Sequence, residues 1–117
     1  MGLVLIVDDE ESILEHMVRV VSEAGHQVKG VRNGSLAVEA LESFDADIII
    51  TDLNMPIMNG LQMAKYLRSR DFQRPIIVIT GYDDHKERAK RLGVTGFVSK
   101  PFKDQELIDC IAGYCKK

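Results

Sequence analysis

The sequence is poor in cysteine and carries no excess of positive charge. Its two cysteines, Cys110 and Cys115, are five positions apart on an expected helix, which places them about 140° apart around the helix axis. A disulfide between them is therefore not expected, and both are interpreted as reduced. The formal net charge is −3, and acids crowd near residues 8–11, 45–52 and 83–84, so we expect no direct nucleic-acid partner.

The chain also lacks the features of a membrane-bound or secreted protein. No apolar run is long enough to cross a bilayer, and the first residues, MGLVLIVDDEE, have no basic segment before their short apolar run. We therefore expect a cytoplasmic protein with no membrane partner. Low-complexity tracts and internal linkers are absent, and 117 residues suit one domain spanning 1–117, with roughly two-thirds of its unfolded surface buried.

Several ligand-binding motifs are missing as well. The sequence contains neither G-x-G-x-x-G after its first apolar run nor G-x-x-x-x-G-K-[ST], which argues against a nucleotide-binding Rossmann or P-loop domain. The three histidines, His16, His26 and His85, are scattered and form no His/Cys cluster, which argues against zinc. We interpret them as structural or surface residues.

What the sequence does contain is an alternation of apolar segments with helix-like segments. The apolar segments are continuous runs, which is typical of strands covered on both faces of a sheet. The predicted strands are 3–7, 27–31, 47–51, 75–80 and 96–99. Strands joined by helical crossovers pair in parallel with right-handed connections. The pattern therefore predicts a single α/β domain with five β/α repeats and an open, doubly wound, five-stranded parallel sheet.

Apolar residues at helical spacing predict the helices between these strands. The expected core-facing residues are Ile13, Met17, Val20, Val21 and Ala24, closed by Gly25; Ala37, Leu41 and Phe44; Leu61, Ala64 and Leu67; and Leu107, Ile108, Ile111, Ala112 and Cys115. The charged segment 83–92 offers only Ala89 and Leu92 as an apolar edge. We interpret it as a solvated surface helix, with a mobile or partner-facing element as the alternative.

Polar residues stand at four of the five predicted strand ends. Asp8 and Asp9 follow the first strand, and Asp52 follows the third. Thr80 ends the fourth strand, and Lys100 follows the fifth. Each acid, or the threonine, could merely cap the next helix, and the lysine could be a surface charge. Together, however, they lie where open α/β sheets bind their ligands, outside the carboxyl ends of the strands.

Three carboxylates at one sheet edge repel one another unless a positive charge lies between them. A divalent cation resolves this repulsion, and oxygen ligands with a turn carbonyl after Asp52 suit Mg²⁺. With Thr80 as hydroxyl donor and Lys100 as ammonium group, Asp52 could attack phosphorus in line and form an aspartyl phosphate. The long loop 54–60, which contains Pro and Gly, is expected to be functional.

Four motifs support this chemistry and cover nearly the whole chain in order: VDDE at 7–10, DLNMPIMNG at 52–60, VITGY at 78–82 and FVSKPF at 97–102. With them, the sequence closely resembles the receiver domains of two-component response regulators. The resemblance implies a flavodoxin-like (βα)5 fold with strand order 2-1-3-4-5, as in chemotaxis receivers. It also implies a histidine kinase or phosphotransfer protein as phosphodonor, and a downstream output protein or domain as partner.

The resemblance assigns roles to the residues at the strand ends. It implies that Asp52 is the phosphoacceptor and a metal ligand, that Asp9 binds Mg²⁺ directly, and that Asp8 acts on the metal mainly through water. The backbone carbonyl of Asn54 is implied as the third protein ligand. Lys100 matches the phosphate-binding lysine of the family.

Further positions match residues that regulate family members. Thr80 and Phe97 match the switch pair, whose hydroxyl and ring respond to phosphorylation, although Phe97 as a plain core aromatic is the alternative. Pro101 stands where the family often has a cis peptide bond. Asn54 and Tyr82 occupy variable positions that tune dephosphorylation. We predict that Tyr82 shields the acyl phosphate from water and prolongs the life of the phosphorylated form.

These inferences predict a phosphorylation-dependent signalling switch of a two-component phosphorelay. The protein would catalyse only its own phosphorylation and dephosphorylation, and it would alter its surface over 83–115 for an output partner. One open alternative is a non-phosphorylated interaction module that keeps only the fold. Another is a Mg²⁺-dependent phosphohydrolase with an aspartyl-phosphate intermediate, which needs an acid two residues after the nucleophile, where this chain has Asn54.

Overall fold

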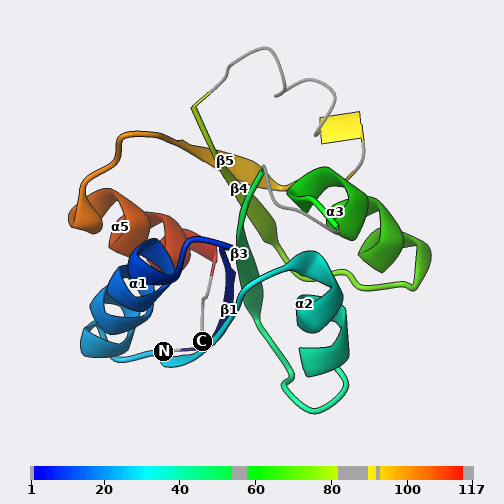
Figure 1. The fold of residues 1–117 in the computed structure, drawn as a ribbon, viewed down its shortest axis with the longest axis horizontal. Helices are drawn as coiled ribbons and strands as arrows, with labels where there is room; N and C mark the ends of the chain where they lie inside the picture. Colours follow the sequence, from blue (N-terminus) through cyan, green and yellow to red (C-terminus); the bar gives the residue numbers. More distant parts are fainter. Residues whose placement is uncertain (1, 54–57, 82–89, 92, 115–117) are drawn as a thin grey trace.

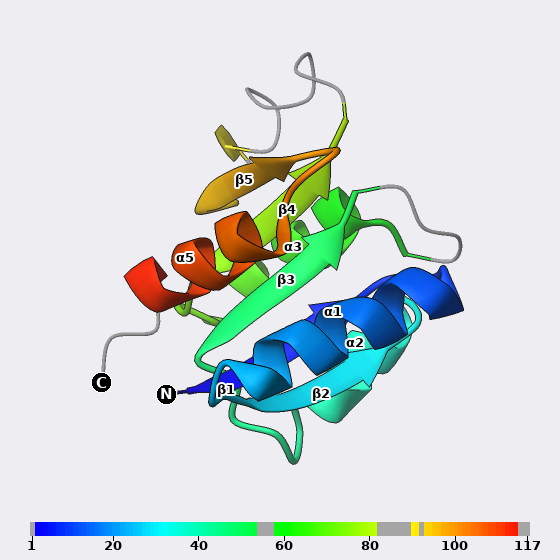
Figure 2. The same ribbon diagram turned by 90° about the vertical axis from the view of Figure 1, so that its left-hand side faces the viewer.

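The computed structural model describes residues 2–53, 58–81, 90–91 and 93–114. These residues form one parallel sheet in the order β2-β1-β3-β4-β5, with helices on both faces (Figures 1 and 2). The strands are β1 (Leu3–Val7), β2 (Gln27–Val31), β3 (Ile48–Asp52), β4 (Ile76–Thr80) and β5 (Gly96–Ser99). The helices are α1 (Glu11–Glu23), α2 (Gly34–Ala40), α3 (Gly60–Ser69) and α5 (Asp104–Tyr114). The predicted doubly wound, flavodoxin-like α/β fold is confirmed.

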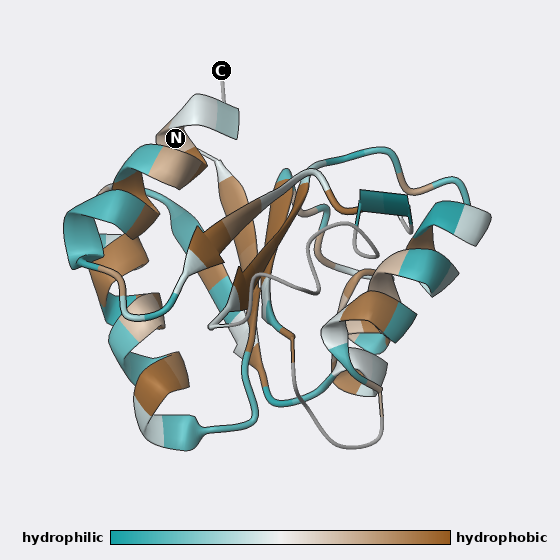
Figure 3. Cartoon of the chain, turned by 90° about the horizontal axis from the view of Figure 1, so that it is seen from above, coloured by the Kyte–Doolittle hydropathy of each residue, from teal (hydrophilic) through white to brown (hydrophobic). Residues whose placement is uncertain are grey.

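The central strands carry most of the hydrophobic core. Every residue of β3 and β4 is buried, and β1 is buried from Val4 onward. Helices α1 and α5 cover one face of the sheet, and α2 and α3 cover the other. Figure 3 shows the apolar strands lying between helices that alternate apolar and polar residues. Burial of each isoleucine side chain in this layer contributes roughly 2 kcal/mol to folding.

The strand register brings the functional candidates to one edge of the sheet. The pairs nearest this edge are Val7 with Thr51, Asp52 with Ile79, and Thr80 with Ser99. Because all strands run parallel, Asp8, Asp9 and Lys100 leave the sheet at the edge where Asp52 and Thr80 lie.

Helix α1 departs from its predicted apolar stripe at both ends. The residues buried as predicted are Met17, Val20 and Val21. At the start of the helix, Leu14 is buried instead of Ile13, which is half-buried, and at its end Ala24 is exposed. Val18 and Leu14 lie close to the backbone of Gly30 in β2, where a Cβ would lie 2.9 Å from Val18 Cγ2 and 3.1 Å from Leu14 Cδ1. Gly25 then ends the helix with φ 103°, in the left-handed region.

The remaining helices agree in part with their predicted stripes. The residues buried as predicted are Ala37, Leu61, Ala64, Leu67, Leu107 and Ile111. Helix α2 is shorter than its stripe, since Leu41 is its C-cap and Phe44 lies beyond it, although both pack against the core. Ile108 is half-buried, and Ala112 is exposed rather than core-facing. Cys110 is a free thiol.

The strands depart from their predictions in burial and in where they begin. The continuous burial expected of all five strands is wrong for the two edge strands: the residues of β2 are exposed or half-buried, and in β5 only Val98 is buried. Strands β3 and β4 begin one residue later than predicted.

Two predicted features lie outside the described residues, namely Cys115 and, apart from 90–91, the predicted helix 83–92. In the part of the chain that is described, no helix has the length and apolar character needed to cross a membrane.

Candidate functional site

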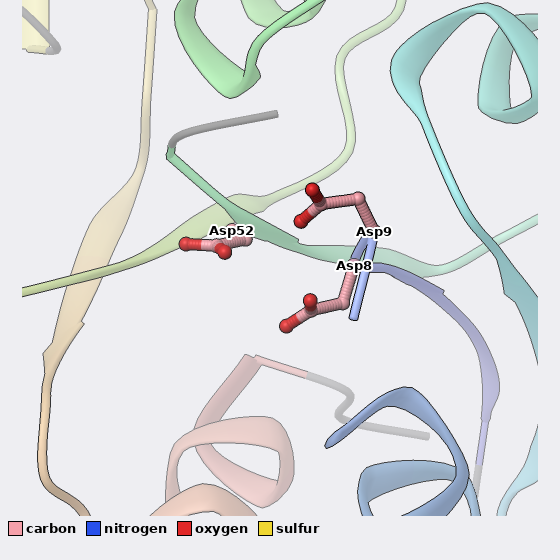
Figure 4. A group of neighbouring side chains, drawn as sticks. All are labelled: Asp8, Asp9 and Asp52. Carbon is pink, nitrogen blue, oxygen red and sulfur yellow. The ribbon is translucent and has the colours of Figure 1, made fainter. Parts of the chain in front are cut away.

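Three carboxylates meet at the carboxyl ends of β1 and β3. Asp8, Asp9 and Asp52 each offer an oxygen atom, and these atoms all lie within 4.8 Å of one another. Figure 4 shows the three side chains grouped at the ends of the two neighbouring strands. Asp8 and Asp52 are buried, whereas Asp9 is exposed. The sequence-predicted acids are therefore brought together, and one of them is open to solvent.

One carboxylate oxygen of Asp8 has no hydrogen-bond partner among the described residues. Its Oδ1 accepts a hydrogen bond from the backbone N–H of Glu10 at 2.9 Å, but its buried Oδ2 has no hydrogen-bond partner in the described part of the chain. Burial first, and then the charges of Asp52 and Asp9, raise the pKa of Asp8 from 3.8 to about 6, against the lowering effects of the Glu10 hydrogen bond and the Lys100 charge.

The donor chemistry of this group fits a hard divalent cation. Mg²⁺ is bound by carboxylate oxygens, commonly with several water molecules retained, and the exposed side chain of Asp9 leaves a solvent-facing side to the cluster. A cation among the three acids would also give the orphaned Oδ2 of Asp8 a partner. The residues present therefore fit Mg²⁺ by both ligand type and unmet charge.

Asp52 is the acid that contacts the lysine. Lys100 Nζ lies 3.3 Å from Asp52 Oδ1, and the same oxygen accepts the backbone N–H of Leu53 at 2.8 Å. The Lys100 side chain is 38% exposed and the Asp52 side chain 11%, so the ammonium group bridges solvent and a nearly buried carboxylate. The Lys100–Pro101 peptide bond is cis, as the resemblance implied.

Thr80 and Phe97 lie on the two strands beyond Asp52. Thr80 is buried at the end of β4, and its carbonyl oxygen accepts the backbone N–H of Lys100 at 2.9 Å. Phe97 pairs with Val78 in the sheet register and packs, half-buried, against the core on the α2 and α3 face. This places Phe97 between the interpretations of core aromatic and switch residue, because it is neither fully buried nor free of packing.

The backbone after Asp52 is closely constrained. The N–H of Gly60 donates to the Leu53 carbonyl at 3.0 Å, and a Cβ on Gly60 would lie 2.6 Å from the Asp52 carbonyl oxygen. Asn59 caps α3 by a reciprocal pair of hydrogen bonds with Gln62. Gly60 was not among the residues predicted for the site, although the Asn-Gly pair that closes the loop was a visible signal. Asn54 and Tyr82, named as metal ligand and dephosphorylation-tuning residues, lie outside the described residues.

The matching family model and the similar curated proteins point to the same family. The model of the response regulator receiver domain matches residues 4–112. The response regulator MprA of Mycolicibacterium vanbaalenii is 33% identical over 107 residues, which are 90% of this chain and 46% of that protein. The sensory transduction protein RegX3 of Mycolicibacterium smegmatis is 34% identical over 110 residues, 92% of this chain and 48% of that protein. The chain thus spans about half the length of these curated relatives.

Two solved structures agree over nearly the whole length of both chains. The chemotaxis response regulator CheY4 of Vibrio cholerae superposes with a TM-score of 0.88 and 30% identity, covering 97% of this chain and 98% of that one. The receiver domain of the Francisella response regulator 1452 gives a TM-score of 0.92 at 25% identity, covering 97% and 96%.

Proposed function

The chain belongs to the response regulator receiver domain family, and from that premise we propose that Asp52 accepts a phosphoryl group from a histidine kinase or a phosphotransfer protein. The observation that carries the proposal is the position of Asp52, which lies beside two further acids on one side and 3.3 Å from the Lys100 ammonium group on the other. A carboxylate so placed is a nucleophile between a cation site and a fixed positive charge.

The proposed transfer is an in-line displacement. A carboxylate oxygen of Asp52 forms a bond to phosphorus, the bond from phosphorus to the imidazole nitrogen of the phosphohistidine breaks, and its electron pair returns to that nitrogen. Lys100 stabilises the charge on the phosphoryl oxygens, and the hydroxyl of Thr80 donates to one of them. The product is an aspartyl phosphate.

Asp8, Asp9 and Asp52, with the carbonyl of Asn54, are the proposed ligands of Mg²⁺. When bound, the cation supplies positive charge to the phosphoryl oxygens during transfer. Asp9 is the proposed direct ligand, as the family resemblance implies, and Asp8 acts on the cation mainly through a bound water molecule, which would be the partner that its Oδ2 lacks. The chain's own contribution is to hold three acids together before the cation arrives.

The proposed output is a shift between two conformations of the Thr80–Phe97 region. In the phosphorylated state, Thr80 moves toward the phosphoryl group and Phe97 turns into the space that it leaves. The half-buried packing of Phe97 supports a ring with room for two positions. The surface over 83–115 then changes, and a downstream protein or domain responds in the cytoplasm.

Receiver domains are generally signalling modules rather than enzymes. We propose that this chain, a single receiver domain over 1–117, catalyses only its own phosphorylation and dephosphorylation.

The test is mass spectrometry after incubation with Mg²⁺ and a small acyl phosphate as phosphodonor. Wild-type protein should gain one phosphoryl group that is labile in acid and base, and Asp52→Asn should gain none. Asp45→Asn is the matched control, because Asp45 is an exposed acid before β3 that is remote from the strand ends, and it should label like wild type. An adduct that survives in Asp52→Asn would contradict the proposal, and steady release of phosphate from small phosphate esters would favour a phosphohydrolase instead.

A further inference from the structure

A contact between α2 and the chain that returns from Asp52 has no place in the proposed chemistry. Gly34, the first residue of α2, is buried, and the chain at Met58 passes directly over it. A Cβ on Gly34 would lie 2.8 Å from the Met58 carbonyl oxygen, 2.9 Å from its Cγ and 3.0 Å from its Cβ. Real Cβ atoms essentially never approach backbone so closely. Met58 can therefore lie at this position only because Gly34 has no side chain.

Met58 lies two residues before Gly60, whose backbone packs closely against the backbone of Asp52. Asn59 begins α3 through its capping box, and Gly60 follows with its N–H bonded to the Leu53 carbonyl at 3.0 Å. The backbone of Gly60 also lies against the Asp52 carbonyl, where a Cβ would come within 2.6 Å. A displacement of Met58 is therefore passed through Asn59 and Gly60 to the backbone that carries Asp52, because each step is a close backbone contact.

We infer that Gly34 is a positioning residue for the acidic site. Its missing side chain lets Met58 lie close to α2, and this contact sets where Asp52 stands relative to Asp8 and Asp9. The inference rests on the proposed function in one respect, namely that the three acids hold Mg²⁺. Gly34 itself begins α2, whereas the three acids lie at the carboxyl ends of β1 and β3.

Substitution by alanine isolates this contact. Gly34 is not among the glycines with positive φ, so its backbone conformation is open to alanine. Alanine also has the higher helix propensity, so α2 itself should form at least as well. Any loss at the acidic site then comes from the added methyl group pressing on Met58.

Gly113 provides the matched control. It too is a helical glycine, in α5, and a Cβ added there would meet no atom within 4 Å. Gly113→Ala therefore makes the same chemical change without the contact.

The experiment is a titration of each metal-free protein with Mg²⁺, followed by the amide resonances of Asp9, Asp52 and Leu53, alongside thermal unfolding. Gly34→Ala should raise the Mg²⁺ dissociation constant roughly tenfold, as loss of an outer support of a metal site commonly does. It should also shift the Asp52 and Leu53 resonances before metal is added. Gly113→Ala should leave both readouts unchanged. A lower unfolding temperature with an unchanged dissociation constant would show a merely structural role and overturn the inference.

Met58→Ala keeps the test decisive where Gly34→Ala folds poorly. This variant removes the side-chain part of the contact without creating overlap, and it should weaken Mg²⁺ binding about two- to threefold. An unchanged dissociation constant in a folded Met58→Ala protein would overturn the inference. The proposed function fails separately: wild-type protein that binds Mg²⁺ but never accepts a phosphoryl group would refute phosphotransfer and leave the effect of Gly34 on the metal measurable.

Discussion

The pairing of charged residues differs between the edge of the central sheet where the strands begin and the edge where they end. At the edge where the strands begin, charged side chains are matched with partners from several segments. At the edge where they end, Asp8, Asp9 and Asp52 are crowded together, and Asp8 Oδ2 has no partner in the described part of the chain. The first edge is organised for stability, whereas the second retains unfavourable electrostatics that a cation or a phosphoryl group can relieve.

Arg68 is the clearest residue of the stable edge. Its guanidinium donates to the carbonyl oxygens of Gly93, Phe72 and Arg74 at 2.9, 2.6 and 2.8 Å, and to the Thr95 hydroxyl at 3.3 Å. It thereby joins the end of α3 to the segments that enter β4 and β5. Asp47 has a similar role before β3, since it accepts the Leu3 N–H at 2.9 Å and pairs with Arg74.

The largest effect on stability is expected from Arg68→Met. The methionine keeps much of the apolar side chain but leaves three carbonyl oxygens without their donor, so we expect the free energy of unfolding to fall by about 3 kcal/mol. Urea denaturation measures this change. Arg70→Met is the matched control, because Arg70 is exposed and bonds only the hydroxyl of Tyr66 among the described residues, and it should cost less than about 1 kcal/mol. Equal losses of unfolding free energy in the two variants would show that the hydrogen bonds of Arg68 contribute no more to stability than the contacts of Arg70.

Addition of Mg²⁺ should produce the next largest effect, and it should act at the other edge. At a free concentration one hundred times its dissociation constant, a ligand that binds only the folded state adds about 2.7 kcal/mol to the free energy of unfolding. We expect wild type to show this gain and Asp52→Asn to lose most of it. Asp47→Asn should keep it in full, because Asp47 lies at the opposite edge of the sheet. A gain that persists in Asp52→Asn would place the cation elsewhere.

The contrast between the edges also explains what the sequence could predict. The isoleucine-rich runs of β3 and β4 identify strands buried on both faces, and parallel strands carry the residues after them to one edge. For that reason Asp8, Asp9, Asp52, and Lys100 could be grouped from their positions alone. The grouping needs only strand direction, which the helical crossovers determine.

The remaining features depend on contacts between distant segments. Leu14 rather than Ile13 enters the core, although either residue fits the helical spacing, and Leu14 and Val18 pack over Gly30, which lies on another element and has no side chain. The network of Arg68 could not be foreseen, because its acceptors are backbone carbonyls, which every residue has. The orphaned oxygen of Asp8 is likewise a property of the surroundings and not of the residue.

A smaller effect, of opposite sign at the two edges, is expected from neutralising one acid. In metal-free protein at pH 7, Asp8→Asn should raise the free energy of unfolding by about 1 kcal/mol, because it removes a buried charge beside two others and keeps an acceptor for the Glu10 N–H. Asp47→Asn should lower it by about 1 kcal/mol, because it weakens the pair with Arg74. Urea denaturation in the presence of a chelator measures both. Changes of the same sign would show that the edges do not differ in this respect.

The smallest effect is expected from His26, which lies at the stable edge and whose Nδ1 accepts the backbone N–H of Gly2 at 3.1 Å. Burial lowers the pKa of His26 from 6.5, and the charge of the amino terminus lowers it further, so the folded protein favours the neutral ring. The unfolded chain therefore takes up a proton first as the pH falls through 6.5, and the contribution of His26, present above that pH, is lost below it. Denaturation of wild type and His26→Gln between pH 7.5 and about 5 measures this loss. The glutamine variant cannot take up the proton, so its free energy of unfolding should fall less steeply with decreasing pH, whereas parallel curves would mean that protonation of His26 does not affect folding.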